Sequence, residues 1–319
     1  VPLLSIDGWV VVSCLLTWLL LYFGSYKSLE KTLLVMVLFF SFMTLIIAIS
    51  MQSTEYQVSF TQISQGLTFS FPTEYLPLAL AVFGFTGISY GEIMAYTYWC
   101  LEKGYANNSE NDLEETKHWI RTMQTDVWVT VFFITLGTLP FFFLGAGVLN
   151  NVPELQESLA TSSFWDVDVI SSLQNMFSLV LGGWAKWLFI ILAFFVLFST
   201  LLSGTAAFTR TISDYLISMG LVKEKIDTRG KLIKLIAFLI PFLSGLFYFI
   251  LPNPITLLLI AGIWAAMGLP IVNIGALYLI NKLDPVLQPK IGTIIILWIS
   301  LVLQLFLAVL IVYDISLNF

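Results

Sequence analysis

Three glycines and one carboxylate lie in the middle of a membrane-length apolar segment, Leu76–Leu101. Gly84, Gly87 and Gly91 stand close together, and Glu92 follows them directly. A helix that only crosses lipid gains nothing from central glycines, because glycine weakens a helix interior. Discontinuous helices with such breaks build the binding sites of many secondary transporters. The segment is therefore predicted to be a broken transmembrane helix.

A break in this segment would supply oxygen ligands for a cation. Because a helix end leaves backbone carbonyls without intrahelical partners, the carbonyls over Gly84–Gly87 can coordinate a positive ion. The second half-helix is expected to start near Ser89–Gly91, where Ser89 or Thr86 can cap or coordinate. The alternative is that the glycines only let helices pack closely. The candidate substrate pathway is Gly84, Phe85, Thr86, Gly87, Ser89, Tyr90, Glu92 and Asn273, with Phe85, Thr86 and Ser89 as candidate metal ligands.

Four charged residues are candidates for a proton pathway or a gate. Glu92 is an acid inside a membrane segment, and such a residue is by default a candidate for a functional role. The alternative is that Glu92 is a first-turn acid that the helix dipole stabilises. Asp126 opens the next apolar segment and is interpreted as an interfacial helix-start residue, with proton relay as the alternative. Arg210 and Asp214 are four residues apart, so they can pair on one helix face, for structure or as a cytoplasmic gate.

Asn273 places an amide inside a later apolar segment, three residues after Pro270. Such an amide can line a pathway or bond across helices, and the cross-helix bond is the favoured interpretation. Pro140, Pro241 and Pro270 fall inside apolar segments and are expected to be tolerated kinks.

Several classes of protein are excluded by what the chain lacks. It has no nucleophile–base–acid set, no phosphate loop and no zinc-ligand spacing, and its single histidine, His118, lies in a polar loop. Both cysteines, Cys14 and Cys100, fall inside apolar segments. The basic residues form no stripe that would suit a nucleic acid. We therefore expect no enzyme activity, no cofactor, no nucleic-acid partner and no obligate protein partner.

The composition is that of a polytopic membrane protein. Of the 319 residues, 58% are hydrophobic and 11% are charged, whereas a soluble domain carries about 25% charged residues. Apolar segments of about 20 residues are candidate spans, and in lipid each must be helical. The predicted fold is all-α, a single transmembrane domain over residues 1–319 with eight spans: Gly8–Gly24, Thr32–Met51, Leu76–Leu101, Val127–Leu149, Trp184–Thr209, Leu232–Leu251, Ile255–Ile280 and Ile291–Tyr313.

The basic residues predict the orientation of these spans. All Lys and Arg residues except Lys186 fall in or beside alternate loops, and the positive-inside rule places such loops in the cytoplasm. The predicted cytoplasmic loops are 24–31, 102–126, 217–231 and 281–290. Within the second of these, residues 107–125 read as an amphipathic surface helix, with Leu113 and Trp119 opposed to Glu115 and Lys117.

Four stretches of the chain resemble the Nramp-related transporters, a branch of the LeuT-like inverted-repeat group. They are FGSYKSLEK within Leu19–Leu34, GFTGISYGEIMAYTYWCLEKGYA in the broken span, LFSTLLSGTAAFTRTISD at Leu197–Asp214 and AGIWAAMGLPIVNIGALYLINK at Ala261–Lys282. The resemblance covers nearly the whole chain and implies that the eight spans match the family's helices four to eleven. Three helices, including the family's metal-binding first helix, are then expected before Val1.

The chain departs from the metal site that this resemblance implies. The family's Met-Pro-His stretch in the sixth helix falls at Ile88, Ser89 and Tyr90, and its tenth-helix glutamine falls near Gly262. Without the soft thioether, the ligands are oxygens, which suit magnesium or another hard ion.

The sequence therefore predicts a secondary active transporter of a divalent metal cation that works by alternating access, with proton coupling open. Its partners would be the transported ion and membrane lipid. Two alternatives remain: transport of a small organic solute, such as an amino acid or an amine, on the same fold, or a transport-inactive membrane scaffold.

Overall fold

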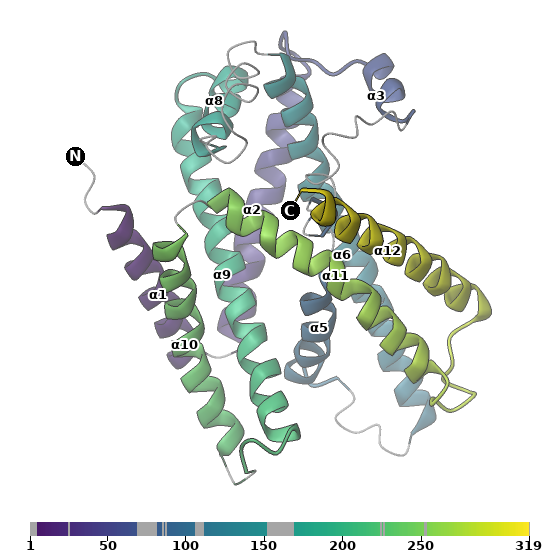
Figure 1. The fold of residues 1–319 in the computed structure, drawn as a ribbon. Coiled ribbons are helices and arrows are strands. Elements are labelled where there is room, and N and C mark those ends of the chain that lie inside the picture. Colours follow the sequence, from purple (N-terminus) through teal and green to yellow (C-terminus); the bar gives the residue numbers. More distant parts are fainter. Residues whose placement is uncertain are drawn as a thin grey trace. The chain divides into compact units, whose positions relative to one another are not determined.

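In the part of the chain that the computed structural model describes, the regular secondary structure is all helical, with no strand there. Figure 1 shows the fold. The described residues are 5–24, 26–68, 82–84, 86, 88–105, 112–151, 169–223, 225, 227–251 and 254–318.

Six helices in this part of the chain are long and apolar enough to cross a membrane. They are α2 (Tyr26–Met51), α6 (Leu113–Gly147), α9 (Ala185–Ser218), α10 (Thr228–Ile250), α11 (Pro254–Ile280) and α12 (Ile291–Asn318). The first predicted span is α1 (Ile6–Phe23), a shorter apolar helix, and the third contains the short helix α5 (Tyr90–Glu102). The remaining elements are α3 (Phe60–Gly66), a 3₁₀ turn at Leu149–Asn151 and α8 (Val169–Leu181).

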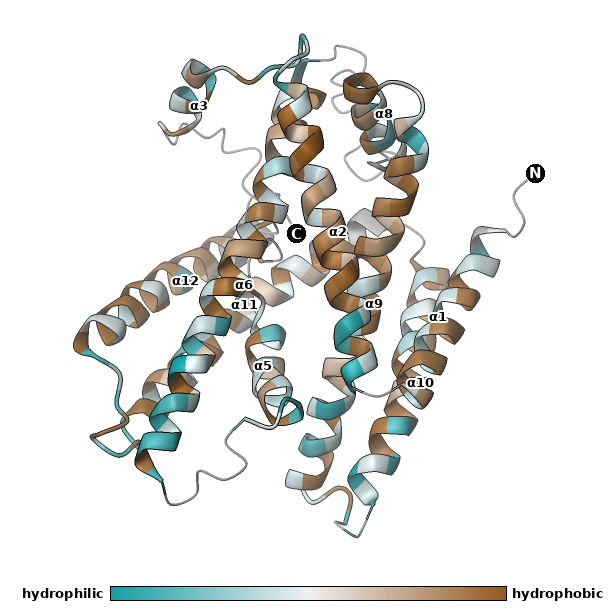
Figure 2. Cartoon of the chain, turned by 180° about the vertical axis from the view of Figure 1, so that it is seen from behind, coloured by the Kyte–Doolittle hydropathy of each residue, from teal (hydrophilic) through white to brown (hydrophobic). Residues whose placement is uncertain are grey.

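The amphipathic surface helix predicted at residues 107–125 is not a separate helix from Leu113 onward, and residues 107–111 lie outside the described part of the chain. Residues from Leu113 onward are instead the first turns of α6, which runs unbroken for 35 residues. A helix of that length is about 52 Å long, whereas the hydrocarbon core of a bilayer is about 30 Å thick. The polar N-terminal part of α6, teal in Figure 2, therefore extends beyond the hydrocarbon. There the Lys117 ammonium bonds the Glu114 carboxylate at 2.8 Å and lowers the pKa of Glu114.

The described chain forms two compact units, Val1–Thr68 with Asp126–Asn253 and Phe69–Thr125 with Pro254–Phe319. The boundary between them falls inside α6, between Thr125 and Asp126. The single transmembrane domain over residues 1–319 stays a prediction.

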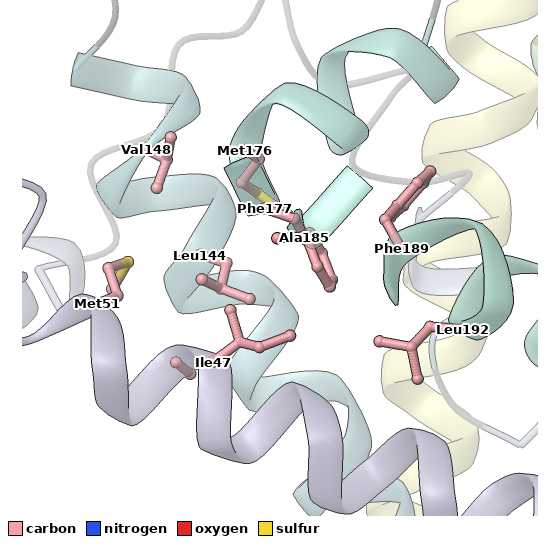
Figure 3. Close-up of a cluster of buried hydrophobic side chains, with 10 residues drawn as sticks. Ile47, Met51, Leu144, Val148, Met176, Phe177, Ala185, Phe189 and Leu192 are labelled. Atoms are coloured by element: carbon pink, nitrogen blue, oxygen red, sulfur yellow. The ribbon is translucent and has the colours of Figure 1, made fainter. Parts of the chain in front are cut away.

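The first unit has a buried apolar cluster to which four helices contribute (Figure 3). Phe177 of α8 is fully buried, and its ring meets the Phe189 ring of α9 edge-on at 5.2 Å between centroids. α2 and α6 approach closely at their C-terminal ends, where a Cβ on Gly147 would lie 2.6 Å from the Tyr56 carbonyl oxygen and 2.8 Å from the Met51 sulfur. The ten buried members are Ile47, Ala48, Met51, Leu144, Val148, Met176, Phe177, Ala185, Phe189 and Leu192.

A pair of helices, α1 and α10, packs beside α9 in the same unit. The Cys14 thiol donates a hydrogen bond to the Pro241 carbonyl at 3.1 Å, and the Trp18 ring meets Phe238 edge-on at 5.5 Å. Pro241 and Pro140 lie inside helices that continue through them, as expected for prolines in membrane segments.

The second unit contains α5, the first turns of α6, and the helices α11 and α12. The Tyr96 hydroxyl donates to the Met123 carbonyl at 3.2 Å, and the Tyr105 ring stacks on Trp119 at 4.8 Å. These contacts attach α5 to the polar turns of α6. α5 also packs on α11, and α11 packs on α12.

Candidate functional site

A helix start lies where the sequence predicts the break. Ile88 and Ser89 are outside any helix, and α5 begins at Tyr90. Ser89 has extended backbone angles and is the N-cap. Its amide donates to Glu92 Oε2 at 2.7 Å, and the Glu92 amide donates back to Ser89 Oγ at 3.4 Å. This is a capping box, which satisfies two backbone donors that a helix start would leave unpaired.

The capping box gives Glu92 a local structural role. Its exposed carboxylate accepts a hydrogen bond from the Ser89 amide in the first turn of α5. This arrangement agrees with the alternative interpretation of Glu92, an acid that stabilises the start of a helix. The Ser-x-x-Glu spacing from Ser89 to Glu92 is itself a sequence signal for this motif. A proton or transport role for Glu92 stays a prediction.

Residues before the break are helical, and one hydroxyl there is already bonded. Val82, Phe83, Gly84 and Thr86 have helical backbone, whereas Phe85 and Gly87 lie outside the described residues. The exposed Thr86 hydroxyl donates to the Val82 carbonyl at 2.6 Å. Because the Thr86 proton points back to its own helix, its oxygen retains lone pairs for a cation.

Both sides of the break pack against α11 within the second unit. A Cβ on Gly84 would overlap the Gly262 carbonyl and lie 3.1 Å from the Ala266 amide nitrogen. Beyond the break, a Cβ on Gly268 would overlap the Tyr90 ring. Gly84 and Gly268 are thus needed for close packing, in agreement with the packing alternative at Gly84. Gly84 packs closely against α11 and also precedes the break. The interpretation as a packing residue and the interpretation as part of a broken helix are therefore compatible.

The α11 side of this contact was only partly predictable from sequence. Gly262 brings its backbone carbonyl close to Gly84. Phe83 packs on Ala266, together with Ile263 and Leu307. The signal for this surface is a pair of small residues, Gly262 and Ala266, four apart on one helix face.

Asn273 bonds across to α12. It is 92% buried, since its exposed fraction is 8%. Its Nδ2 donates to the Leu297 carbonyl and to Gln304 Oε1, both at 3.3 Å, and Gln304 Nε2 donates to Ser300 Oγ at 3.1 Å. No partner for Asn273 Oδ1 occurs among the described residues. The structure therefore agrees with the favoured cross-helix bond, and a place for Asn273 on the substrate pathway stays a prediction.

The predicted Arg210–Asp214 pair is wrong. Asp214 accepts instead from Arg229 at the start of α10, with Nε to Oδ1 at 2.7 Å and Nη2 to Oδ2 at 3.3 Å. The Arg210 guanidinium donates to the Ala206 carbonyl one turn back on α9, at 2.8 Å. The planar fork of Arg229 fits both carboxylate oxygens at once, which favours this partner over one on the same helix. Residue spacing along α9 carries no signal for a partner on α10.

Asp126 does not start a helix, so that interpretation is also wrong. α6 begins at Leu113, and Asp126 lies in its interior, where its carbonyl accepts from the Thr130 hydroxyl at 2.8 Å. Asp126, Arg210 and Asp214 belong to the first unit, whereas Ser89 and the break belong to the second. Their proposed roles in a proton pathway or gate stay predictions.

These helices define the class of the protein as an integral, multi-pass membrane protein. Residues 2–314 match the family profile described as Nramp, natural resistance-associated macrophage protein-like. The chain therefore belongs to the Nramp family, a family of membrane transporters rather than enzymes, and the resemblance read from its sequence is confirmed. Membership of this family suggests divalent metal transport. Searches of curated proteins and of solved structures found no match.

Proposed function

We propose that this protein is a secondary active transporter that moves a divalent metal cation through alternating access, with the cation bound at the break between Gly84 and Tyr90. The observation that carries the proposal is the interrupted helix before α5 in a chain of the Nramp family. The proposal includes eight spans in a LeuT-like inverted repeat. It also includes cytoplasmic loops at 24–31, 102–126, 217–231 and 281–290, supported by the positive-inside rule.

The electrostatics of the break favour a cation over an anion. The C-terminal end of a helix carries partial negative charge, and the N-terminal end carries partial positive charge. At α5 that positive end is already met by the Glu92 carboxylate through its bond to the Ser89 amide. A substrate carboxylate would have to displace Glu92 to reach this amide. The capping box therefore argues against an amino acid bound by the α5 N-terminus.

The available ligands indicate a hard ion. Ile88 replaces a thioether with a hydrocarbon, so the candidate ligands are backbone carbonyls and the hydroxyls of Thr86 and Ser89. Hard divalent ions such as Mg²⁺ prefer oxygen ligands, whereas thioethers favour softer metals. We expect the chain to accept Mg²⁺ and Mn²⁺ and to discriminate against Cd²⁺. A proton as the coupling ion is part of the proposal, with Glu92 as its first candidate.

The test is uptake of Mg²⁺ and Mn²⁺ by the full-length protein in proteoliposomes, against empty vesicles, with excess amino acids as competitors. Thr86→Val keeps the shape of the side chain and removes its oxygen, so uptake should fall. Thr97→Val is the matched control, because the Thr97 hydroxyl is likewise exposed and bonds back to its own helix, to Met94 at 2.8 Å. Competition by amino acids but not by metals, or equal effects of the two variants, would overturn the proposal.

A further inference from the structure

A groove lies between α2 and α6 in the first unit, and all of its lining residues belong to that unit. Its volume is about 380 Å³. On α2 it is lined from Leu45 to Gln52, and on α6 from Phe132 to Phe143. Leu139 and Ile49 are 47% and 63% exposed, so the walls of the groove are open to the surroundings in this unit.

The groove follows the helix axes. Its α6 wall covers eleven residue steps, from Phe132 to Phe143, which is about 16 Å of helix. Half of a bilayer's hydrocarbon core is about 15 Å. α2 and α6 run in the same direction, because Ser41 lies beside Gly137 and Met51 lies beside Gly147. The α6 wall therefore has about the length of one leaflet's acyl layer, and the α2 wall, from Leu45 to Gln52, covers about 10 Å of it.

The chemistry of the groove is apolar with one amide at its end. Gln52 directly follows the last residue of α2, Met51, and its Oε1 accepts from the Val58 amide at 3.2 Å. This bond fixes the orientation of the side chain and leaves its NH₂ group to donate. Among the described residues, no acceptor pairs with that group. The other polar lining residue, Thr135, donates to its own helix at the Val131 carbonyl, at 2.8 Å.

We propose that this groove binds one acyl chain of a membrane phospholipid, from the leaflet at which α2 ends, and that the Gln52 amide donates to the ester oxygen at the head of that chain. Both walls are helices of membrane-spanning length and hydropathy, so hydrocarbon is the medium that suits the groove. An apolar groove left unfilled loses dispersion contacts along its lining, whereas a flexible chain recovers them. A single fixed donor at one end suits a ligand with one polar end and a long apolar body.

The test uses the full-length protein in nanodiscs of phosphatidylcholine doped with a phosphatidylcholine that carries a diazirine in one acyl chain. After irradiation, mass spectrometry of peptides locates the labelled residues. We expect labels on the peptides that contain Leu45–Gln52 and Phe132–Phe143. Thr135→Phe, which fills the groove, should abolish them. Thr138→Phe is the matched control, because Thr138 is exposed on the same helix but lies outside the groove.

A second variant tests the polar end. Gln52→Leu removes the donor while keeping the groove apolar, so labelling should persist but spread along α6 instead of peaking at one position. Equal labelling of wild type, Thr135→Phe and Thr138→Phe would overturn the proposal. So would a disulfide between two copies of an Ile49→Cys variant in the membrane, since the groove would then be covered by a second chain. None of these readouts depends on metal transport.

Discussion

Two substitutions at Glu92 distinguish its role as a helix cap from a role in cation binding. In a capping box, glutamine can replace glutamate, because either side chain accepts from the N-cap amide. Glu92→Gln should therefore keep the bond to the Ser89 amide, which is 2.7 Å long in the wild type, and remove only the negative charge. Glu92→Ala removes both the charge and the bond.

The expected magnitudes follow from the position of Glu92 in the first turn of α5. A charge there interacts with the helix end by about 0.3–1 kcal/mol at an exposed site. The carboxylate is exposed, so its Coulomb attraction for a cation a few ångströms away is at most about 1 kcal/mol, and loss of the charge should weaken cation binding at the break by about two- to five-fold. Loss of a cap costs about 1 kcal/mol of stability. Glu92→Gln should thus raise KM and lower Tm only slightly, through loss of the charge alone. Glu92→Ala, which also loses the cap, should raise KM by a similar factor and lower Tm further.

The assay is metal uptake by the full-length protein in proteoliposomes, combined with a thermal melt of the same preparation. Glu55→Gln serves as the control, because Glu55 is an exposed acid in the turn after α2 and should change neither quantity. A wild-type KM in Glu92→Gln at every pH would refute the reasoning, and Glu92 would then act only as a cap.

Two further predictions concern packing and the ion pair. Gly84→Ala and Gly268→Ala should each lower stability by about 1–3 kcal/mol through overpacking against α11 and Tyr90, whereas Gly275→Ala, where a Cβ meets nothing within 4 Å, should melt like the wild type. Equal melts for all three would contradict the close contact. Asp214→Asn should remove the pair with Arg229, which is partly exposed. It should therefore cost less than about 1 kcal/mol, with a difference in Tm that shrinks as salt rises; a salt-independent difference would indicate another role for Asp214.

Local sequence signals predicted the start of α5 and most of the long helices. Apolar length located α2, α9, α10, α11 and α12, because a membrane segment must satisfy its own backbone. The central glycines and the possible cap at Ser89 placed the start of α5 near Ser89–Gly91, and the helix begins at Tyr90. These features depend on neighbours three or four positions away, which a sequence displays directly.

Two errors in the sequence analysis came from reading polarity and length too strictly. The charged residues after Asp112 suggested a separate helix, yet no glycine or proline interrupts the chain between Asp112 and Gly137, so α6 continues. α8 was missed because its 13 residues are too few for a span. Its apolar positions, including Leu173, Met176 and Phe177, follow the helical period and carry a signal that a shorter window would detect.

The remaining features depend on contacts between distant segments. The Arg229–Asp214 pair joins residues 15 apart in the sequence, and the close approach of Gly84 to Gly262 joins residues even more distant. No spacing rule specifies such partners. Packing selects them once the helices have formed.

The central claim is that a divalent cation binds at the break before α5. The most direct measurement is the rate at which a membrane-impermeant thiol reagent modifies Ile88→Cys in the full-length protein, with all native cysteines, Cys14 and Cys100 among them, replaced by alanine. Ile88 is 36% exposed, and Ile93→Cys is the matched control at 43% exposure on α5. We predict that Mg²⁺ or Mn²⁺ slows modification at residue 88 and leaves residue 93 unchanged. Identical rates at residue 88 with and without saturating metal would contradict the account.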